Sequence, residues 1–229
     1  MEIYREKIQL EKEVPASGIV RIMQDMGGAH NRCTGLSRQV LREKGLFWII
    51  VSNYINIERY PEPEEELEII TWRGRRKRTL LPRYLIGKDK GGNIIFRASA
   101  LWAMADAESH KMVNPLKFGL DPQETVTGQE CRLPEILKPV KTEHECSFVV
   151  PREYIDSNHH MNNTRYFDMC ERCLADKLQG KKLREADIDY ISEAVLSETI
   201  KVSWAENGAK TYIQGEEKNT VFRMNFKYE

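Results

Sequence analysis

The stretch NNTRYFDMCERCLADKL, residues 162–178, decides the fold class, because it predicts one helix with a single apolar stripe. The residues of this stripe recur at helical spacing: Tyr166, Cys170, Cys173, Leu174 and Leu178. Asn162 or Asn163 could cap the start of the helix. A helix with one apolar face needs another element to cover that face, so its neighbours in the sequence decide how it packs.

Strand patterns lie on both sides of this helix. Residues 146–150 predict a short strand before it. After it, Ile200, Val202 and Trp204 alternate with polar residues, as Phe222, Met224 and Phe226 do further on. Between these two stretches, Asn207-Gly208 is a strong signal for a two-residue hairpin turn. The second half therefore reads as strand, helix and then about four strands.

The first half of the chain has the same order. Residues 2–10 predict a short strand, and Ser17 could cap a following helix. A long strand is expected over residues 48–60, with Ile49, Val51, Ile55 and Ile57 on one face. Three further strands are expected over residues 67–73, 82–87 and 94–105, the last two joined by a glycine-containing turn at residues 89–93.

A proline-containing stretch, residues 122–142, separates the halves and predicts an ordered linker. One helix followed by an antiparallel sheet packs economically when the sheet wraps around the helix, which is the hotdog fold. We therefore expect the α+β class, with two tandem hotdog folds in one chain at residues 1–130 and 131–229. The alternative is two unrelated α+β modules.

Composition narrows the class of protein. Lys plus Arg and Asp plus Glu each number 35, so no global field attracts the chain to nucleic acid or to an anionic membrane. The longest strongly apolar run, residues 46–51, is too short to span a bilayer, and we expect a soluble, cytoplasmic protein. The five cysteines do not have the spacing of a disulfide framework, so reduced thiols are expected.

The segment IDSNHHMNN, residues 155–163, places an acid, three amides and two imidazoles just before the second helix. Free backbone N–H groups at a helix start can stabilise a developing oxyanion, so this cluster could be catalytic. It could equally be a set of capping and turn residues with surface histidines, and residue types alone do not decide. A metal site that uses His159, His160, Cys170 and Cys173 is disfavoured, because no second pair of ligands accompanies them.

Two motifs make a family resemblance specific. Asp156-x-Asn158-x-His160-x-Asn162-Asn163 is similar to the active-site motif of plant and bacterial acyl-acyl-carrier-protein thioesterases. Residues 189–194, Asp-Tyr-Ile-Ser-Glu-Ala, resemble a downstream segment of that family that usually reads Glu-Tyr-Arg-Arg-Glu-Cys. Similarity also occurs at residues 48–51, 59–61, 70–72 and 97–102, so it covers nearly the whole chain.

The resemblance implies a double hotdog whose second half carries catalytic residues Asp156, Asn158, His160 and Glu193. Asp156 would be the nucleophile or the group that positions water, and Glu193 would be the general base. His160 would orient groups or share protons, Asn158 would hydrogen-bond Asp156 or the water, and His159 would be a supporting or surface residue. The cysteine that the family has beside the glutamate is Ala194 here, which disfavours a papain-like mechanism.

The family's substrate is an acyl chain on acyl carrier protein, attached through phosphopantetheine. Met23 and Met26 are candidates to line the acyl pocket, although ordinary core packing would also explain them. The densest basic stretch could dock the acidic carrier protein, through Arg73, Arg75, Arg76, Lys77 and Arg78, with Arg83 nearby.

The expected activity is therefore hydrolysis of fatty acyl-acyl carrier protein, which would end fatty-acid synthesis. No cofactor, metal, nucleic acid or membrane is expected, and a homodimer is allowed but not required, because the repeat can complete one hotdog pair. The alternatives are a hotdog acyl-CoA thioesterase and a non-catalytic acyl-binding protein on the same scaffold. Acyl-chain length cannot be read from the sequence.

Overall fold

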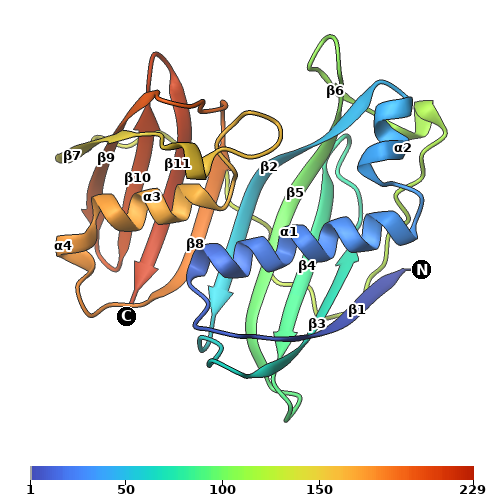
Figure 1. The fold of residues 1–229 in the computed structure, drawn as a ribbon, viewed down its shortest axis with the longest axis horizontal. Coiled ribbons are helices and arrows are strands. Elements are labelled where there is room, and N and C mark those ends of the chain that lie inside the picture. The colour runs from blue at the N-terminus through green and yellow to red at the C-terminus, as the bar shows by residue number, and fades with distance from the viewer. Residues whose placement is uncertain (1) are drawn as a thin grey trace. The chain divides into compact units, whose positions relative to one another are not determined.

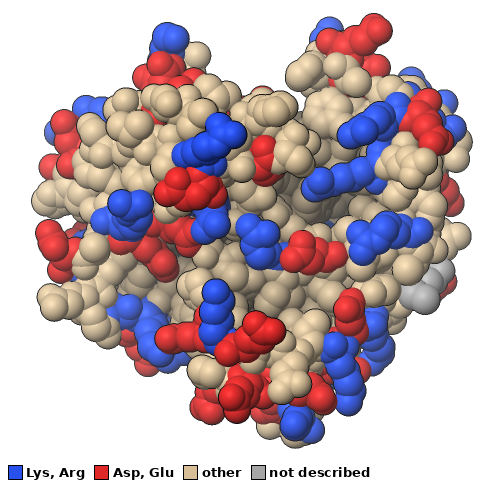
Figure 2. Space-filling model, in the orientation of Figure 1, with Lys and Arg blue, Asp and Glu red and all other residues tan. Residues whose placement is uncertain are grey.

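The computed structural model describes residues 2–229, which form two compact units. The first unit comprises the chain up to Val14 together with Arg21–Pro134, and the second comprises Pro15–Val20 together with Glu135–Glu229. Basic and acidic side chains are interspersed on the face drawn in Figure 2, as a net charge of zero leads one to expect. None of the helices within residues 2–229 has both the length and the apolarity to cross a membrane.

The first unit is an antiparallel sheet with a long helix against it. Its strands lie in the order β1-β3-β4-β5-β2, and the short β6 pairs with β5. Figure 1 shows α1 lying across one face of these strands. Met23 and His30 on this helix are fully buried. The elements are β1 (Ile3–Gln9), α1 (Ala16–Cys33), α2 (Arg38–Glu43), β2 (Leu46–Ile57), β3 (Glu66–Arg73), β4 (Leu81–Lys88), β5 (Ile94–Asp106), β6 (Met112–Val113) and the 3-10 helix η1 (Pro115–Phe118). The residues of α1 up to Val20 are counted with the second unit, and the rest of the helix with the first.

The second unit repeats this arrangement around a shorter helix. Its strands lie in the order β8-β11-β10-β9-β7, and the rings of Tyr166 and Phe167 on α3 contact Phe222 and Phe226 of β11. The elements are β7 (His144–Val149), the 3-10 helix η2 (Arg152–Tyr154), α3 (Arg165–Cys173), α4 (Ala175–Leu178), β8 (Leu183–Tyr190), β9 (Thr199–Asn207), β10 (Lys210–Glu216) and β11 (Thr220–Tyr228).

Both units have one topology. If the strands of each unit are counted from its own first strand, the order in both sheets is first, third, fourth, fifth, second. Every pairing between neighbours within each unit is antiparallel. In both units, the helix that packs on the sheet follows the first strand and precedes the second strand along the chain. The predicted α+β class with two tandem hotdog folds is thus confirmed.

A glycine and a phenylalanine occupy the same place in the two sheets. Gly87 on β4 pairs with Phe96 on β5, and Gly215 on β10 pairs with Phe222 on β11. A Cβ atom on Gly87 would lie 2.2 Å from the Phe96 ring, and one on Gly215 would lie 2.0 Å from the Phe222 ring. Each buried ring therefore covers the backbone of its glycine, and only a residue without a side chain fits there.

Some local predictions were wrong. Ser17 lies inside α1, which begins at Ala16, so it does not cap that helix. The register of β2 against β5 shifts between Ile50 and Ser52, so Ile49 and Val51 are only partly buried, unlike Ile55 and Ile57. The short helix α2 was not predicted, because only Leu41 among its residues is buried. The reason in each case is that pairing and packing with distant residues override the local pattern.

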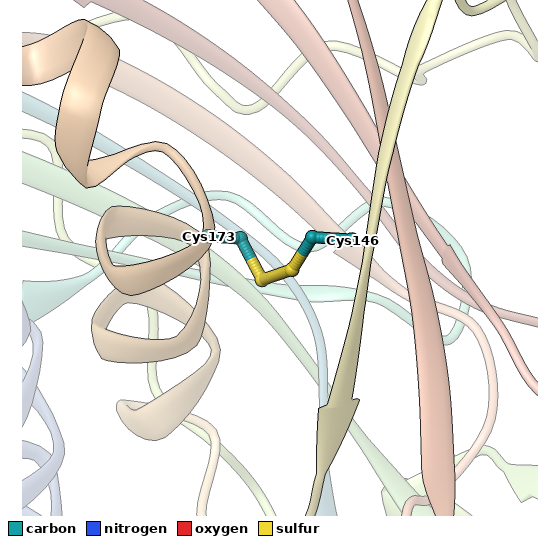
Figure 3. The surroundings of a disulfide bond; sticks show 2 residues. All are labelled: Cys146 and Cys173. Atoms are coloured by element: carbon teal, nitrogen blue, oxygen red, sulfur yellow. A yellow bond between two sulfur atoms is a disulfide. The ribbon is translucent and has the colours of Figure 1, made fainter.

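Reduced thiols were also expected, and for one pair this was wrong. A disulfide joins Cys146 on β7 to Cys173 at the end of α3 (Figure 3). Cys173 was assigned to the apolar stripe of the helix, whereas its sulfur is bonded to the first strand of the second unit. Among the other cysteines, Cys170 is a buried free thiol, as the stripe predicted.

The proline-containing segment between η1 and β7 has no helix or strand, yet it is held in place. Ser99 donates to the backbone carbonyl of Arg132 at 2.7 Å in the first unit. In the second unit, the backbone N–H groups of Glu135 and Leu137 donate to the carboxylates of Asp187 and Asp189, at 3.0 and 2.7 Å. The segment is therefore an ordered linker, as predicted.

Candidate active site

The polar segment before α3 folds into a tight turn. The Asp156 N–H donates to the His160 carbonyl at 2.9 Å, and the His159 N–H donates to the Asp156 carbonyl at 3.1 Å. An isolated β-bridge between Ile155 and Met161 flanks the turn. His159 has a φ of +66°, in the left-handed region that non-glycine residues seldom adopt. Its side chain is exposed, so its backbone conformation shapes the turn while its ring faces away from the core.

Asp156 and Asn158 form one hydrogen-bonded group within this turn. The Asp156 Oδ1 accepts the Asn158 backbone N–H at 2.7 Å, and the Asn158 side-chain amide donates to Oδ2 at 3.5 Å. The first bond fixes the carboxylate in an Asx-type turn. The second is long and weak, so Oδ2 keeps most of its capacity to accept another hydrogen bond.

His160 and Glu193 form a second group, contributed by two segments that are far apart in the sequence. The His160 Nε2 lies 3.0 Å from the Glu193 Oε2. The side chains are 35% and 59% exposed, so both can reach a molecule in solvent. Glu193 lies in the loop after β8 (Leu183–Tyr190).

Backbone contacts hold these two segments together. The Met161 N–H donates to the Ala194 carbonyl at 2.7 Å, and His160 forms a β-bridge with Val195. Ala194 itself is fully buried. The meeting of His160 and Glu193 is thus built by the backbone on both sides of the pair and does not depend on a surface ion pair alone.

The start of α3 is capped differently from the prediction. The helix begins at Arg165, with Thr164 in the cap position, and the Thr164 side chain makes no capping bond. The Asn162 Oδ1 instead accepts the N–H and the hydroxyl of Thr164, at 3.0 and 2.8 Å, which orders the turn just before the helix. Asn163 is held through its carbonyl, which accepts the Tyr190 hydroxyl at 3.0 Å.

Tyr166 is a neighbour of the site, although its sequence pattern predicted only a place in the apolar stripe of the helix. It is buried, and its hydroxyl forms a hydrogen bond with the backbone of Ala194. Burial raises the pKa of the Tyr166 phenol strongly, and the nearby Glu193 charge adds to the effect. Tyr166 therefore stays protonated, and it contacts the segment that carries Glu193 through the backbone of Ala194. The only sequence signal for a place beside the site was that Tyr166 follows the polar segment closely, four residues after Asn162.

Large apolar side chains are exposed in the loop that carries Glu193, and these were also missed. Ile191, Val195 and Leu196 are 46%, 38% and 43% exposed, in the same loop as Glu193. Val149, at the end of β7, is 59% exposed. Exposed apolar side chains in one loop are typical of a surface that binds an apolar partner.

The two acyl-pocket candidates lie on α1. Met23 and Met26 are 0% and 4% exposed, as both pocket lining and core packing require. The lining role stays a prediction.

The basic stretch is divided by the fold. Arg73 is only 3% exposed at the end of β3, so its assignment to a docking surface was wrong, and the same holds for Arg83 at 4%. Arg75, Lys77 and Arg78 are exposed and Arg76 is partly so, in the turn between β3 and β4. The Arg76 N–H donates to the Glu124 carboxylate at 2.8 Å, which anchors this turn.

The chemistry at the site is that of carboxylates, an imidazole and an amide. Across residues 2–229 no three His, Cys, Asp or Glu side chains form a group that could hold a metal ion. In the same range, no hydrogen bond joins the Asp156 carboxylate to His160 or Glu193. The site therefore offers two separate acid–base groups, with Asp156 and Asn158 on one side and His160 with Glu193 on the other.

Comparison with known families identifies both halves of the chain. Residues 1–117 match the family described as acyl-ACP thioesterase N-terminal domain, and residues 137–228 match the acyl-ACP thioesterase C-terminal domain. The second match includes all four predicted catalytic residues.

Curated relatives and solved structures agree. The chain is 25% identical over 207 residues to an oleoyl-acyl carrier protein thioesterase of Coriandrum sativum, covering 82% of this chain and 56% of the relative. It is 22% identical over 164 residues to a palmitoyl-acyl carrier protein thioesterase of Gossypium hirsutum, covering 66% and 39%. The chain thus spans about half the length, or less, of these curated relatives.

An acyl-ACP thioesterase from Bacteroides thetaiotaomicron superposes with a TM-score of 0.84 at 18% identity, over 99% of this chain and 98% of that one. The 12:0-ACP thioesterase from Umbellularia californica gives 0.81 at 15% identity, over 99% and 97%. At this identity the superpositions establish the fold.

Proposed function

Because the chain belongs to the acyl-ACP thioesterase family, we propose that it hydrolyses the thioester between a fatty acyl chain and acyl carrier protein. The observation that carries the proposal is the contact of His160 with Glu193 beside the Asp156 turn. The products are a free fatty acid and the thiol of the carrier's phosphopantetheine, so the reaction ends synthesis of that acyl chain. The cytoplasmic location stays a prediction.

The residues divide the reaction between them. Water adds to the thioester carbonyl, the C–S bond breaks, and the sulfur leaves as a thiolate that takes up a proton. Glu193 accepts the proton of the water on Oε1, while Oε2 is held by the His160 Nε2–H. His160 thereby orients the base and shares the proton.

Asp156 can act in one of two ways. Its Oδ2, bound only weakly by Asn158, can hold the attacking water or attack the carbonyl itself to form a short-lived anhydride. Asn158 fixes the carboxylate in either case, through its backbone N–H.

A thiol nucleophile beside the glutamate is not part of the proposal. Where the family usually has cysteine, this chain has Ala194, whose methyl group is fully buried and whose carbonyl is bonded to Met161. The free cysteines are Cys33, Cys131 and Cys170, and none belongs to the Asp156 turn or to the loop of Glu193. We therefore assign the chemistry to the carboxylates.

The two halves of the chain would have different roles in substrate binding and catalysis. We assign the acyl pocket to residues 1–130, with Met23 and Met26 as lining, and catalysis to residues 131–229. The apolar side chains around Glu193 would receive the arm that carries the thioester, and the turn of Arg75, Arg76, Lys77 and Arg78 would contact the acidic carrier.

A hydrolysis screen tests this function. Saturated and unsaturated acyl chains of several lengths are offered on acyl carrier protein and on coenzyme A, and kcat/KM is measured for each. We expect faster hydrolysis of the carrier-bound form at the preferred length. Equal or faster hydrolysis of the coenzyme A form would favour an acyl-CoA thioesterase, and binding without turnover would favour an acyl-binding protein.

A further inference from the structure

Two arginines are buried side by side in the first unit. Arg73 on β3 and Arg83 on β4 are register partners and are only 3% and 4% exposed. Like charges directly opposite each other on neighbouring strands repel. A buried charge is costly unless an opposite charge or strong hydrogen bonds compensate it.

Neutral groups make all the direct contacts of these guanidinium groups. Arg83 donates to His30 Nδ1 at 3.1 Å, to Thr71 Oγ1 at 3.3 Å and to Asn31 Oδ1 at 2.8 Å. Arg73 donates to the same Asn31 Oδ1 at 3.4 Å and to Thr34 Oγ1. We call Arg73, Arg83, His30, Asn31, Thr34 and Thr71 the arginine cluster.

The cluster lacks a negative partner. Across residues 2–229 neither arginine forms an ion pair, and the Arg73 Nε has no hydrogen-bond partner although it is buried. The exposed Asp121 acts on Arg73 only through its field. Burial lowers the pKa of Arg73 to about 10, and burial together with Arg73 lowers the pKa of Arg83 to about 9. The site therefore holds donors and positive charge in excess of its acceptors.

The cluster continues the surface of α1 that carries the acyl-pocket candidates. Met23, Met26, Gly27 and His30 recur at helical spacing, so they share one face of the helix. Gly27 lies against Arg83, because a Cβ atom there would be 3.2 Å from the Arg83 Nε. Along α1, the two methionines thus lie about one helical turn before His30, which contacts the buried guanidinium group of Arg83.

We propose that the arginine cluster binds a carboxylate, and that this carboxylate is the free end of the acyl chain. The second part rests on the proposed function, with the acyl chain lying along Met23 and Met26. Guanidinium groups match carboxylates in charge and in fork geometry, so a carboxylate supplies both the missing charge and the missing acceptors. A methyl end would leave the same donors unpaired, and sites built for hydrogen bonds reject such ligands strongly.

The activity experiment uses matched pairs of carrier-bound acyl chains, in which the distal end is either a carboxylate or its methyl ester, over a series of lengths. At the best length we expect kcat/KM to be at least about tenfold higher for the carboxylate. Arg83→Met should bring this ratio close to one. Arg5→Gln, which removes an exposed arginine of the same unit, should leave the ratio unchanged. No preference at any length in the wild-type protein would overturn the acyl-chain assignment.

A binding experiment separates this inference from the proposed function. Thermal unfolding of the wild-type protein is followed in acetate and in phosphate against chloride at equal ionic strength. We expect a saturable rise in Tm with acetate that Arg83→Gln abolishes and Arg5→Gln keeps. If no thioester is hydrolysed but acetate stabilises, the proposed function fails and the carboxylate site stands. A rise with phosphate alone, or with neither anion, would overturn the site, and Arg83→Lys tests the same point if Arg83→Gln does not fold.

Discussion

Asp156 carries the simplest test at the scale of a single residue. Asp156→Asn keeps an Oδ1 that can accept the Asn158 N–H, so the turn should persist, while the charge needed for either proposed role is lost. We expect kcat for a carrier-bound substrate to fall by roughly 10²- to 10⁴-fold with little change in Tm. His159→Asn is the matched control, because asparagine tolerates the left-handed conformation of that exposed residue. Near-normal turnover of Asp156→Asn would remove Asp156 from the mechanism.

The pair of His160 and Glu193 should behave as one unit. We expect His160→Ala and Glu193→Gln each to lower kcat/KM, and the double variant to be little worse than the poorer single variant, because each residue acts through the other. A double-mutant cycle on carrier-bound substrate measures this. Losses that multiply in the double variant would show that the 3.0 Å contact has no role in catalysis.

At the scale of elements, the turn between β3 and β4 is the candidate docking surface. Reversing Arg75, Arg76 and Lys77 to Glu should raise KM for carrier-bound substrate several-fold and leave KM for a small soluble thioester unchanged, because only the carrier is acidic and large. The control reverses three other exposed bases of the first unit, Lys12, Lys90 and Lys111. Docking at this turn would be refuted if the variant of Arg75, Arg76 and Lys77 raised KM equally for both substrates. It would also be refuted if the control triple variant raised KM for the carrier-bound substrate as much.

Helix α3 contains a carboxylate whose ionisation is unfavourable. Burial, with a smaller contribution from Asp168, raises the pKa of Glu171 to about 7 from an ordinary value of 4.5. The folded state thus holds this proton more tightly than the unfolded state, so stability should decrease as pH rises from about 4.5 to 7. Glu171→Gln should raise Tm at pH 8 and change it little near pH 4.5.

The control for Glu171 is Asp176→Asn, which removes an exposed charge from the neighbouring helix α4. That variant should change Tm by a similar small amount at both pH values. If Glu171→Gln gives the same flat response as the control, the carboxylate of Glu171 is not desolvated in solution.

At the scale of the whole molecule, the repeat predicts matched effects in the two units. Gly87→Ala and Gly215→Ala should each destabilise the protein by about 1–3 kcal/mol, because the new methyl group overlaps a buried phenylalanine ring. Urea unfolding measures the change. Replacing the ring in the same chain, as in Gly87→Ala with Phe96→Leu, should recover part of the loss.

Gly28→Ala on α1 is the control for these glycines. A Cβ atom there meets only the end of the Arg32 side chain at 3.7 Å, so alanine should stabilise the helix slightly. Equal destabilisation at Gly28 and at the two strand glycines would mean that loss of glycine as such, and not the covering ring, causes the effect.

Much of the architecture was predictable because it depends on local patterns. Alternation along the strands, the helical stripe that starts at Tyr166 and the hairpin signal at Asn207-Gly208 gave the order of elements and the repeat. In detail, the predicted single helix is divided into α3 and α4, and the hairpin turn consists of Gly208 and Ala209 because Asn207 still pairs with Lys210. The exceptions were set by distant residues: the shift in β2 by its pairing with β5, and α2 by packing around Leu41. The polar segment of Asp156, Asn158 and His160 was likewise visible, since those residues lie together in the chain.

The sequence by itself determined the two hotdog folds, the family and the location of the polar segment, because periodicity, turn residues and motifs are local properties of the chain. Only the tertiary structure decided which side chains meet across the sheets. It brought Glu193 to His160 through the backbone contact of Met161 with Ala194, and it joined Cys146 to Cys173. It also buried Arg73 beside Arg83. Exposure and partners depend on the register of strands distant in sequence, so a basic run that is expected at the surface can contain a deeply buried arginine such as Arg73.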